Sequence, residues 1–271
     1  MSAAIAAGGA FEEPTLSWLT AALKSSVGKK CVMGVTGLFL CFFLVVHLAG
    51  NLLLYVGAEQ YNHYAHALHA NPVVIRGAEF FLYLAFIVHI YLAITTHCEN
   101  DAARGHGYAV KQTKRKDRTV NLFGWTPDTT MFVTGAIVLA FILIHVNDFS
   151  WNLFRPAREL EPYDKAVHLL GNVTRGVVYL IGCLVLGVHV AHGFQSAFQS
   201  LGLNHPQFTC WIRKLSILFA FVVTIGFGSF VVWGLGKGGH VESTSTETAP
   251  AAPEEAPAHV HPHPHPEHDQ K

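Results

Sequence analysis

GLFLCFFLVVHLAGNLLLYV, residues 37–56, decides the fold, because a run of about 20 mostly apolar residues is long enough to cross a lipid bilayer as one helix. One ionisable side chain, His47, lies well inside this run. An ionisable group at that depth is costly to bury and marks a candidate functional site. The stretch therefore predicts a membrane helix that carries a functional residue near its centre.

Four more apolar stretches follow, and together they predict an all-α membrane protein with five transmembrane helices. We expect the spans over about residues 31–56, 73–97, 128–149, 172–197 and 211–235. Residues 57–72 are polar and aromatic and predict a short helix at the membrane surface. The membrane domain is expected over residues 28–236. It follows a cytoplasmic or interfacial segment, 1–27, and precedes a His- and Pro-rich tail, 237–271, that is too poor in apolar residues to fold.

The composition agrees with a membrane protein and excludes one class of partner. The 271 residues are 51% hydrophobic and only 13% charged, which is about half the charged fraction of a typical soluble domain. The formal net charge is zero, so the chain lacks the basic surface with which proteins bind nucleic acids. Membrane lipid, and no nucleic acid, is the expected environment.

The distribution of basic residues predicts the orientation. With five spans, the N-terminus and the loops after spans two and four lie on one side of the membrane. That side holds Lys24, Lys29, Lys30, Arg104, Lys111, Lys114, Arg115, Lys116, Arg118, Arg213 and Lys214. Because cytoplasmic loops carry an excess of Lys and Arg, we expect a cytoplasmic N-terminus and an external tail.

Each of the first four spans carries one deep histidine: His47, His89, His145 and His189. At a rise of about 1.5 Å per residue, His47 lies roughly 20 Å from the inner end of its span. Span two runs in the opposite direction, which places His89 in the inner half of the membrane. The same count places His145 in the outer half and His189 in the inner half. The sequence thus predicts an outer pair, His47 with His145, and an inner pair, His89 with His189.

Such pairs predict haem. Two neutral imidazoles that face each other in a bundle core can ligate an iron porphyrin from both sides. Two pairs predict two stacked b haems, roughly 15 Å apart, inside the first four helices. Gly37 and Gly135 each lie ten residues before their histidine, at the expected level of the inner haem. A missing side chain there lets a flat macrocycle approach the helix.

Other roles for histidine compete with haem ligation. A lone histidine in a membrane helix is more often a hydrogen-bonding or proton-relay group, but four at matched depths, one per helix, favour haem. His192, one turn from His189, is the main rival ligand. His97 lies at the inner surface and is expected to contact a propionate or water. The tail run HVHPHPHPEH could chelate a divalent metal, although a solvated tail fits its composition better.

Several of these segments resemble one family. VHLAGN around His47, VHIYLAI around His89, IHV around His145 and HVAHGFQSAFQSLG around His189 resemble the membrane anchor of succinate:quinone oxidoreductases, in its single-chain, five-helix, two-haem cytochrome b form. GAEQYNHYAHALHANP resembles the first outer loop of that family. The resemblance covers about residues 25–235, and it depends on the order and spacing of the motifs more than on any single one.

The resemblance implies the electron-transfer subunit of a succinate dehydrogenase or fumarate reductase, respiratory complex II, in a bacterial plasma membrane. It implies a flavoprotein with FAD and an iron–sulfur subunit on the cytoplasmic face, in heterotrimers that can dimerise. The N-terminus and the basic loop after span two are the implied docking surfaces. Electrons would pass between the iron–sulfur clusters, the inner haem, the outer haem and a quinone, menaquinone, near the outer face. The anchor itself would bind no dicarboxylate.

The chain departs from the family at one functional position. The family's first outer loop carries a glutamate that takes part in quinone protonation, and His69 stands at that position here. A histidine can still exchange protons, with a pKa nearer neutrality. Glu59 and His66 are alternative proton groups, and all three residues fit equally well as ordinary interfacial polar residues.

Two other functions compete with this hypothesis. The chain could be the cytochrome b anchor of another quinone-linked complex, a hydrogenase or a formate dehydrogenase. It could also be a haem-free transporter that uses its histidines for protons or metal. The second alternative is disfavoured because the spans show no clear internal repeat and no pair of Gly- or Pro-broken helices.

Overall fold

A computed structural model describes residues 17–104, 127–153, 160–203 and 205–247 of the chain. These residues form helices and the turns between them, and no strand occurs among them. Within this part of the chain, five stretches are long and apolar enough to cross a membrane: Ser26–Val56, Pro72–Ala103, Thr130–Trp151, Val173–Ser200 and Pro206–Lys237. The predicted all-α, multi-pass architecture is confirmed at this level.

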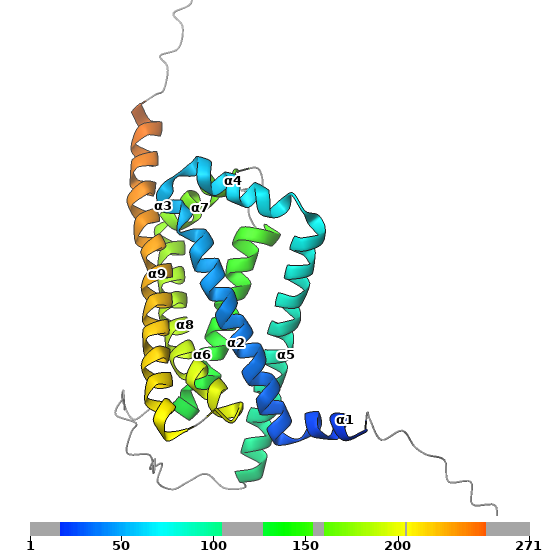
Figure 1. The fold of residues 1–271 in the computed structure, drawn as a ribbon. Coiled ribbons are helices and arrows are strands. Elements are labelled where there is room, and N and C mark those ends of the chain that lie inside the picture. The colour runs from blue at the N-terminus through cyan, green and yellow to red at the C-terminus, as the bar shows by residue number, and fades with distance from the viewer. Residues whose placement is uncertain (1–16, 105–126, 154–159, 204, 248–271) are drawn as a thin grey trace, which may run out of the picture.

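In chain order the elements are α1 (Ser17–Lys24), α2 (Ser26–Asn51), α3 (Leu53–Val56), α4 (Ala58–His69), α5 (Pro72–Arg104), α6 (Pro127–Val146), the π-helix η1 (Asn147–Trp151), α7 (Pro162–Gly171), α8 (Val173–Ser200) and α9 (Pro206–Glu247). Short helices lie between the long helices α2 and α5 and between the long helices α6 and α8. Figure 1 shows α1 projecting sideways at one end of the bundle and α4 and α7 lying across the other. We call these the α1 end and the α4 end.

Local capping explains where the first helices begin and end. The first span starts earlier than predicted, at Ser26, because the Ser25 hydroxyl accepts a hydrogen bond from the Gly28 N–H at 3.0 Å and so caps α2. The predicted surface helix is α4. Pro72 was expected only to help end it, but it also opens α5, where proline is well tolerated. The Asn71 side-chain oxygen accepts from the Val74 N–H at 3.3 Å at this start.

The histidine-bearing helices form an open arc. α2 packs against both α5 and α8, α6 packs against α8, and α5 and α6 contact each other at only a few positions. α9 lies along α8 and α7 and carries no deep histidine. The contacts therefore give the order α5, α2, α8, α6, with α9 packed along α8. Figure 1 shows α9 and α5 at opposite sides of the bundle.

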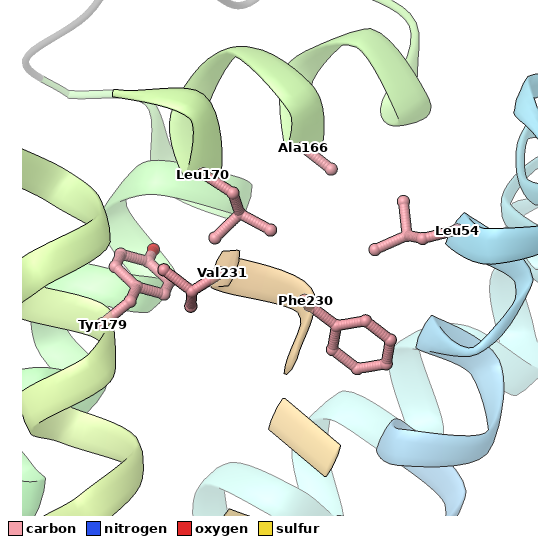
Figure 2. Packing of buried hydrophobic residues seen from close by; sticks show 6 residues of the cluster. All are labelled: Leu54, Ala166, Leu170, Tyr179, Phe230 and Val231. Carbon is pink, nitrogen blue, oxygen red and sulfur yellow. The ribbon is translucent and has the colours of Figure 1, made fainter. Parts of the chain in front are cut away.

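The buried apolar core lies at the α4 end, where α3, α7, α8 and α9 meet. Its members are Leu54, Ala166, Leu170, Tyr179, Phe230 and Val231 (Figure 2). Many large apolar side chains along the spans are exposed; Phe80 and Phe221 are each 63% exposed. In a bilayer these side chains face lipid, so the small core suits a membrane protein.

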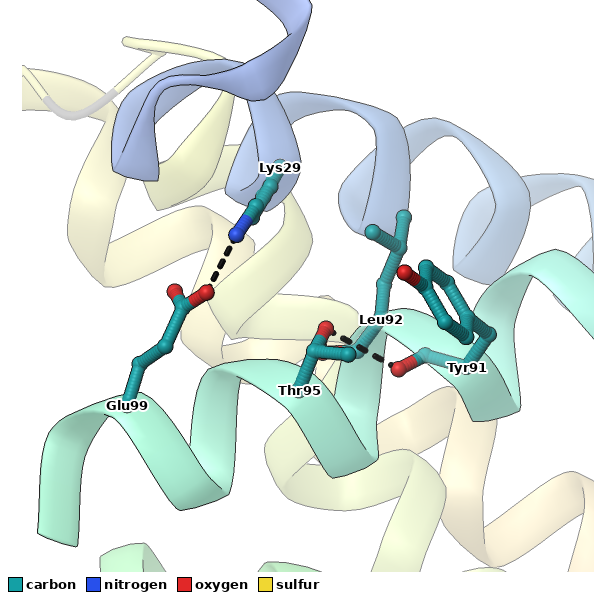
Figure 3. A network of polar contacts seen from close by, with 5 residues as sticks. All are labelled: Lys29, Tyr91, Leu92, Thr95 and Glu99. Carbon is teal, nitrogen blue, oxygen red and sulfur yellow. Dashed lines mark hydrogen bonds and ion pairs between the residues drawn. The ribbon is translucent and has the colours of Figure 1, made fainter. Parts of the chain in front are cut away.

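At the α1 end a polar contact joins two helices of the arc. The Lys29 ammonium on α2 forms an ion pair with Glu99 on α5 (Figure 3). One turn from Glu99, the Thr95 hydroxyl bonds within its own helix and donates to the Tyr91 carbonyl at 3.0 Å. The ion pair therefore fixes how α5 sits against α2 near the membrane surface.

The last helix is longer than its apolar stretch. The tail was expected to be unfolded from residue 237, but α9 continues to Glu247. The first proline after the span is Pro250, and nothing before it removes a backbone donor from the helix. The rest of the predicted tail, 248–271, lies outside the described residues, as do most of the basic loop after span two and residues 1–16.

We expect Gly234→Ala to destabilise the α4 end. A Cβ at Gly234 would lie 2.5 Å from the Leu170 Cβ and 3.0 Å from the Leu170 carbonyl carbon, so α7 would have to move. Overpacking of this kind costs about 1–3 kcal/mol, and thermal unfolding in detergent measures it.

The matched control for this substitution is Gly236→Ala on the same helix, where a Cβ meets nothing within 4 Å. It should be neutral or stabilising by up to about 1 kcal/mol, because alanine favours helix over glycine. Equal melting temperatures for the two variants would contradict the packing of α7 on α9.

Candidate functional site: two pairs of histidines inside the bundle

The structure brings His47 and His145 together. His47 on α2 and His145 on α6 have ring centroids 5.8 Å apart, with their planes at 82°. Metal–imidazole bonds are about 2 Å long, so two rings on opposite sides of one metal ion have centroids about 6 Å apart. The separation of this pair therefore matches that of two imidazoles sharing one metal ion.

Aromatic rings surround this pair on both helices. Phe43 stacks on His47 with centroids 5.2 Å apart at an interplanar angle of 14°, and Phe227 of α9 lies 5.5 Å away. His145 has Phe149 at 5.2 Å and Tyr179 at 5.9 Å. The two imidazoles thus sit in a largely aromatic and apolar environment, where an unpartnered polar nitrogen is costly.

The second predicted pair is held in a different way. The His89 Nδ1 lies 3.3 Å from the Thr36 hydroxyl of α2, and the His189 Nδ1 lies 3.2 Å from the Thr134 hydroxyl of α6. His89 and His189 are also close enough to interact electrostatically with each other. Each ring of this pair therefore sits against the neighbouring helix of the arc.

The two glycines singled out in the sequence lie against these same rings. A Cβ at Gly37 would be 3.2 Å from the His89 Cε1, and a Cβ at Gly135 would be 3.2 Å from the His189 Cε1. A side chain at either position would press on the imidazole. Because Gly37 and Gly135 have no side chain, the His89 and His189 rings can lie close to the backbones of α2 and α6.

These contacts reveal an internal repeat that the sequence analysis missed. Met-x-Val-Thr-Gly occurs at residues 33–37 and again at 131–135, and both copies precede a deep histidine by the same number of residues. In each copy the threonine and the glycine lie against a histidine of another helix, His89 of α5 for the copy in α2 and His189 of α8 for the copy in α6. The signal was present in the sequence as one short motif at a fixed distance before His47 and His145.

A buried charged cluster lies beside His145, and sequence reasoning did not predict it. The Asp148 carboxylate in η1 has no exposed side-chain surface; it accepts from the Tyr179 hydroxyl at 3.2 Å and pairs with the Arg175 guanidinium at 3.3 Å. The Lys165 ammonium donates to the Phe149 carbonyl at 2.9 Å and to the Asn152 side-chain oxygen at 2.6 Å. Burial lowers the pKa of Lys165, and the charge of Asp148 opposes that shift.

A polar link runs from His47 to the surface helix α4. The Asn51 side-chain nitrogen donates to the His47 carbonyl at 2.8 Å and lies 3.4 Å from the His47 Nδ1. The Tyr61 hydroxyl of α4 donates to the Asn51 side-chain oxygen at 3.4 Å. Burial, and secondly the nearby Tyr64, raises the pKa of Tyr61. Tyr61 is therefore a neutral donor at neutral pH.

The predicted proton groups of the first outer loop lie on the exposed surface of α4. The His66 Nε2 is 2.9 Å from a Glu161 carboxylate oxygen, the His69 Nδ1 is 2.8 Å from its own helix's Ala65 carbonyl, and Glu59 is in the first turn. Among the described residues, none of the three hydrogen-bonds to a deep histidine. The structure therefore does not join them to the paired-histidine site.

The two other histidines weighed in the sequence have distinct surroundings. His97 stacks on Phe132 with centroids 4.2 Å apart and lies 3.4 Å from an Asp101 carboxylate oxygen, so it bridges α5 and α6 at the α1 end. His192 lies near His189 and interacts with it electrostatically. His97 thus has a packing role in addition to any polar one.

The residues present fit a porphyrin better than a metal cage. No group of three or more His, Cys, Asp or Glu side chains gathers in the described part of the chain. A porphyrin iron needs only two axial ligands from the protein, because the macrocycle supplies the others. All four deep histidines are partly buried residues of the bundle.

Comparison of the chain with models of known protein families, with curated proteins and with solved structures gives no match. The fold and the site by themselves define a class: a multi-pass helical membrane protein with paired histidines between its helices.

We expect Asp148→Asn to destabilise the fold by about 3–5 kcal/mol, because breaking a buried ion pair leaves an uncompensated charge on Arg175. The substitution also removes the negative charge that stabilises the Lys165 ammonium. The thermal unfolding midpoint in detergent measures the loss. Adding Arg175→Met should recover part of it, since the double variant buries no unpaired charge.

Asp164→Asn is the control for the change in net charge, because Asp164 is exposed on α7. Its effect should stay within about 0.5 kcal/mol. If Asp148→Asn and Asp164→Asn lowered the unfolding midpoint equally, the buried ion pair would contribute no more to stability than an exposed charge.

Proposed function

We propose that this protein is the dihaem cytochrome b membrane anchor of a succinate:quinone oxidoreductase. The observation that carries the proposal is the pairing of histidines across the arc, above all the 5.8 Å separation of the His47 and His145 rings. The resemblance of the surrounding segments to that family supplies the identity of the complex. The pairing supports haem independently of the resemblance.

His47 and His145 would hold the iron of one haem, and His89 and His189 that of the other. The bound haems would supply one-electron transfer across the membrane. The chain's own part is to orient the four imidazoles: Thr36 and Thr134 contact the Nδ1 atoms of His89 and His189, and aromatic rings pack on His47 and His145. The apolar surroundings exclude water from the ligands and so contribute to the redox potential.

The rest of the assignment follows from the resemblance. The partners are a flavoprotein with FAD and an iron–sulfur subunit at the α1 end, taken as the cytoplasmic end in a bacterial plasma membrane. The electron carrier at the α4 end is a quinone, menaquinone. The Glu59 carboxylate and the His66 and His69 imidazoles of α4 are exposed at this end, where protons can be exchanged.

Replacing one ligand should remove one haem and leave the other. His47→Ala and His145→Ala should each lose the haem at the α4 end, whereas His89→Ala and His189→Ala should lose the haem at the α1 end. Pyridine haemochrome quantification and reduced-minus-oxidised spectra of the purified protein measure the stoichiometry, which should fall from about two haems to one.

His192→Ala and His97→Ala are the controls, and both should retain two haems. Loss of a haem from His192→Ala with retention in His189→Ala would reassign that ligand. A colourless wild-type protein would end the haem proposal and bring forward the transporter alternative.

The identity of the complex has its own test. Purified from its native membrane through a tag on this chain, the protein should bring along a flavoprotein with covalently bound FAD and an iron–sulfur protein, and the complex should reduce a quinone analogue with succinate. Haem without succinate activity, together with a hydrogenase or formate dehydrogenase, would keep the ligands and replace the partners.

A further inference from the structure

The two threonines of the repeat each lie within hydrogen-bonding distance of carbonyls of their own helix and of one histidine ring. The Thr36 hydroxyl donates its single proton to its own helix, to the Val32 carbonyl at 2.9 Å or the Met33 carbonyl at 3.1 Å. While the proton is on one of these carbonyls, the hydroxyl can meet the His89 Nδ1, 3.3 Å away, only as an acceptor. The His89 Nδ1 is then protonated, and the Nε2 is the nitrogen left with a lone pair.

The second copy of the repeat has the same geometry. The Thr134 hydroxyl donates to the Thr130 carbonyl at 2.8 Å or the Met131 carbonyl at 3.2 Å, and its oxygen lies 3.2 Å from the His189 Nδ1. The same position of the threonine proton would put both imidazoles of this pair in the same tautomer.

The His47–His145 pair differs at this point. His47 has at its Nδ1 the Asn51 amide at 3.4 Å. Thr36 and Thr134 are on α2 and α6, the helices that carry His47 and His145, but their hydroxyls contact His89 and His189. The hydroxyl contact is therefore specific to one of the two levels in the membrane.

We propose that Thr36 and Thr134 are positioning residues that set the tautomer of His89 and His189 and thereby lower the reduction potential of the haem these histidines hold. This inference rests on the proposed function. A hydrogen bond accepted from Nδ1–H makes the imidazole a more basic ligand, and a more basic ligand favours the oxidised iron. The adjacent glycine of each motif gives the ring the space it needs to reach the hydroxyl.

The test is a redox titration of both haems, followed optically, in Thr36→Val and Thr134→Val. Valine keeps the shape of threonine and removes the acceptor. Each variant should raise the potential of the haem between His89 and His189 and leave the other haem unchanged. Each tenfold change in the relative affinity for oxidised and reduced iron corresponds to 59 mV for a one-electron couple. Selective loss of that haem alone would also support the proposal, because second-shell changes typically cost 10–100-fold in affinity.

Two kinds of control separate the hydrogen bond from a general structural effect. Thr36→Ser and Thr134→Ser retain the hydroxyl and should keep the wild-type potentials. Thr95→Val removes a hydroxyl whose partners within the described residues are backbone carbonyls of α5, and it should change neither haem. Unchanged potentials in both motif variants, equal shifts of both haems, or loss of both haems would overturn the inference. A wild-type protein without haem would instead overturn the proposed function.

Discussion

An imidazole inside an apolar bundle must find a partner for its polar nitrogens, and this requirement governs how the helices of this protein meet. His89 satisfies its Nδ1 on α2 through Thr36, and His189 satisfies its Nδ1 on α6 through Thr134. Neither bond lies within one helix, so each ring orders two helices relative to each other. A buried polar group without such a partner costs several times what the hydrogen bond contributes.

Threonine and glycine act together in each copy of the repeat. The threonine supplies an acceptor for the ring nitrogen. The next residue, Gly37 or Gly135, has no side chain to press on the ring, whose Cε1 would lie 3.2 Å from a Cβ at that position. A larger residue at the glycine would push the ring away from the hydroxyl. The two halves of the bundle share this device but diverge at the α4 end, where α2 ends in Asn51 and α6 passes into a π-helix with Asp148. π-helical turns often occur at functional sites, and this one places a carboxylate near His145.

Much of this arrangement was predictable from sequence, because length and depth in a membrane follow from simple geometry. The apolar runs gave the five spans, and a constant rise per residue paired His47 with His145. The Asp148–Arg175 pair was not predictable, since it depends on how η1 meets α8. The extension of α9 to Glu247 was not predicted, because a polar composition indicates that a segment is solvated and does not show where a helix ends. The threonine contacts could have been found from the repeated Met-x-Val-Thr-Gly motif.

The open edge of the arc shows why the polar contacts matter for cohesion. Lipid tails are as apolar as the helix surfaces, so burial of apolar area does little to join helices within a bilayer. α5 contacts few neighbours besides α2, and what holds it there includes the Lys29–Glu99 ion pair and the Thr36–His89 contact. At the α1 end the His97–Phe132 stack joins α5 to α6. The imidazoles of α5 therefore keep the edge helix in place, and the histidine that would hold a haem is also one that assembles the bundle around it.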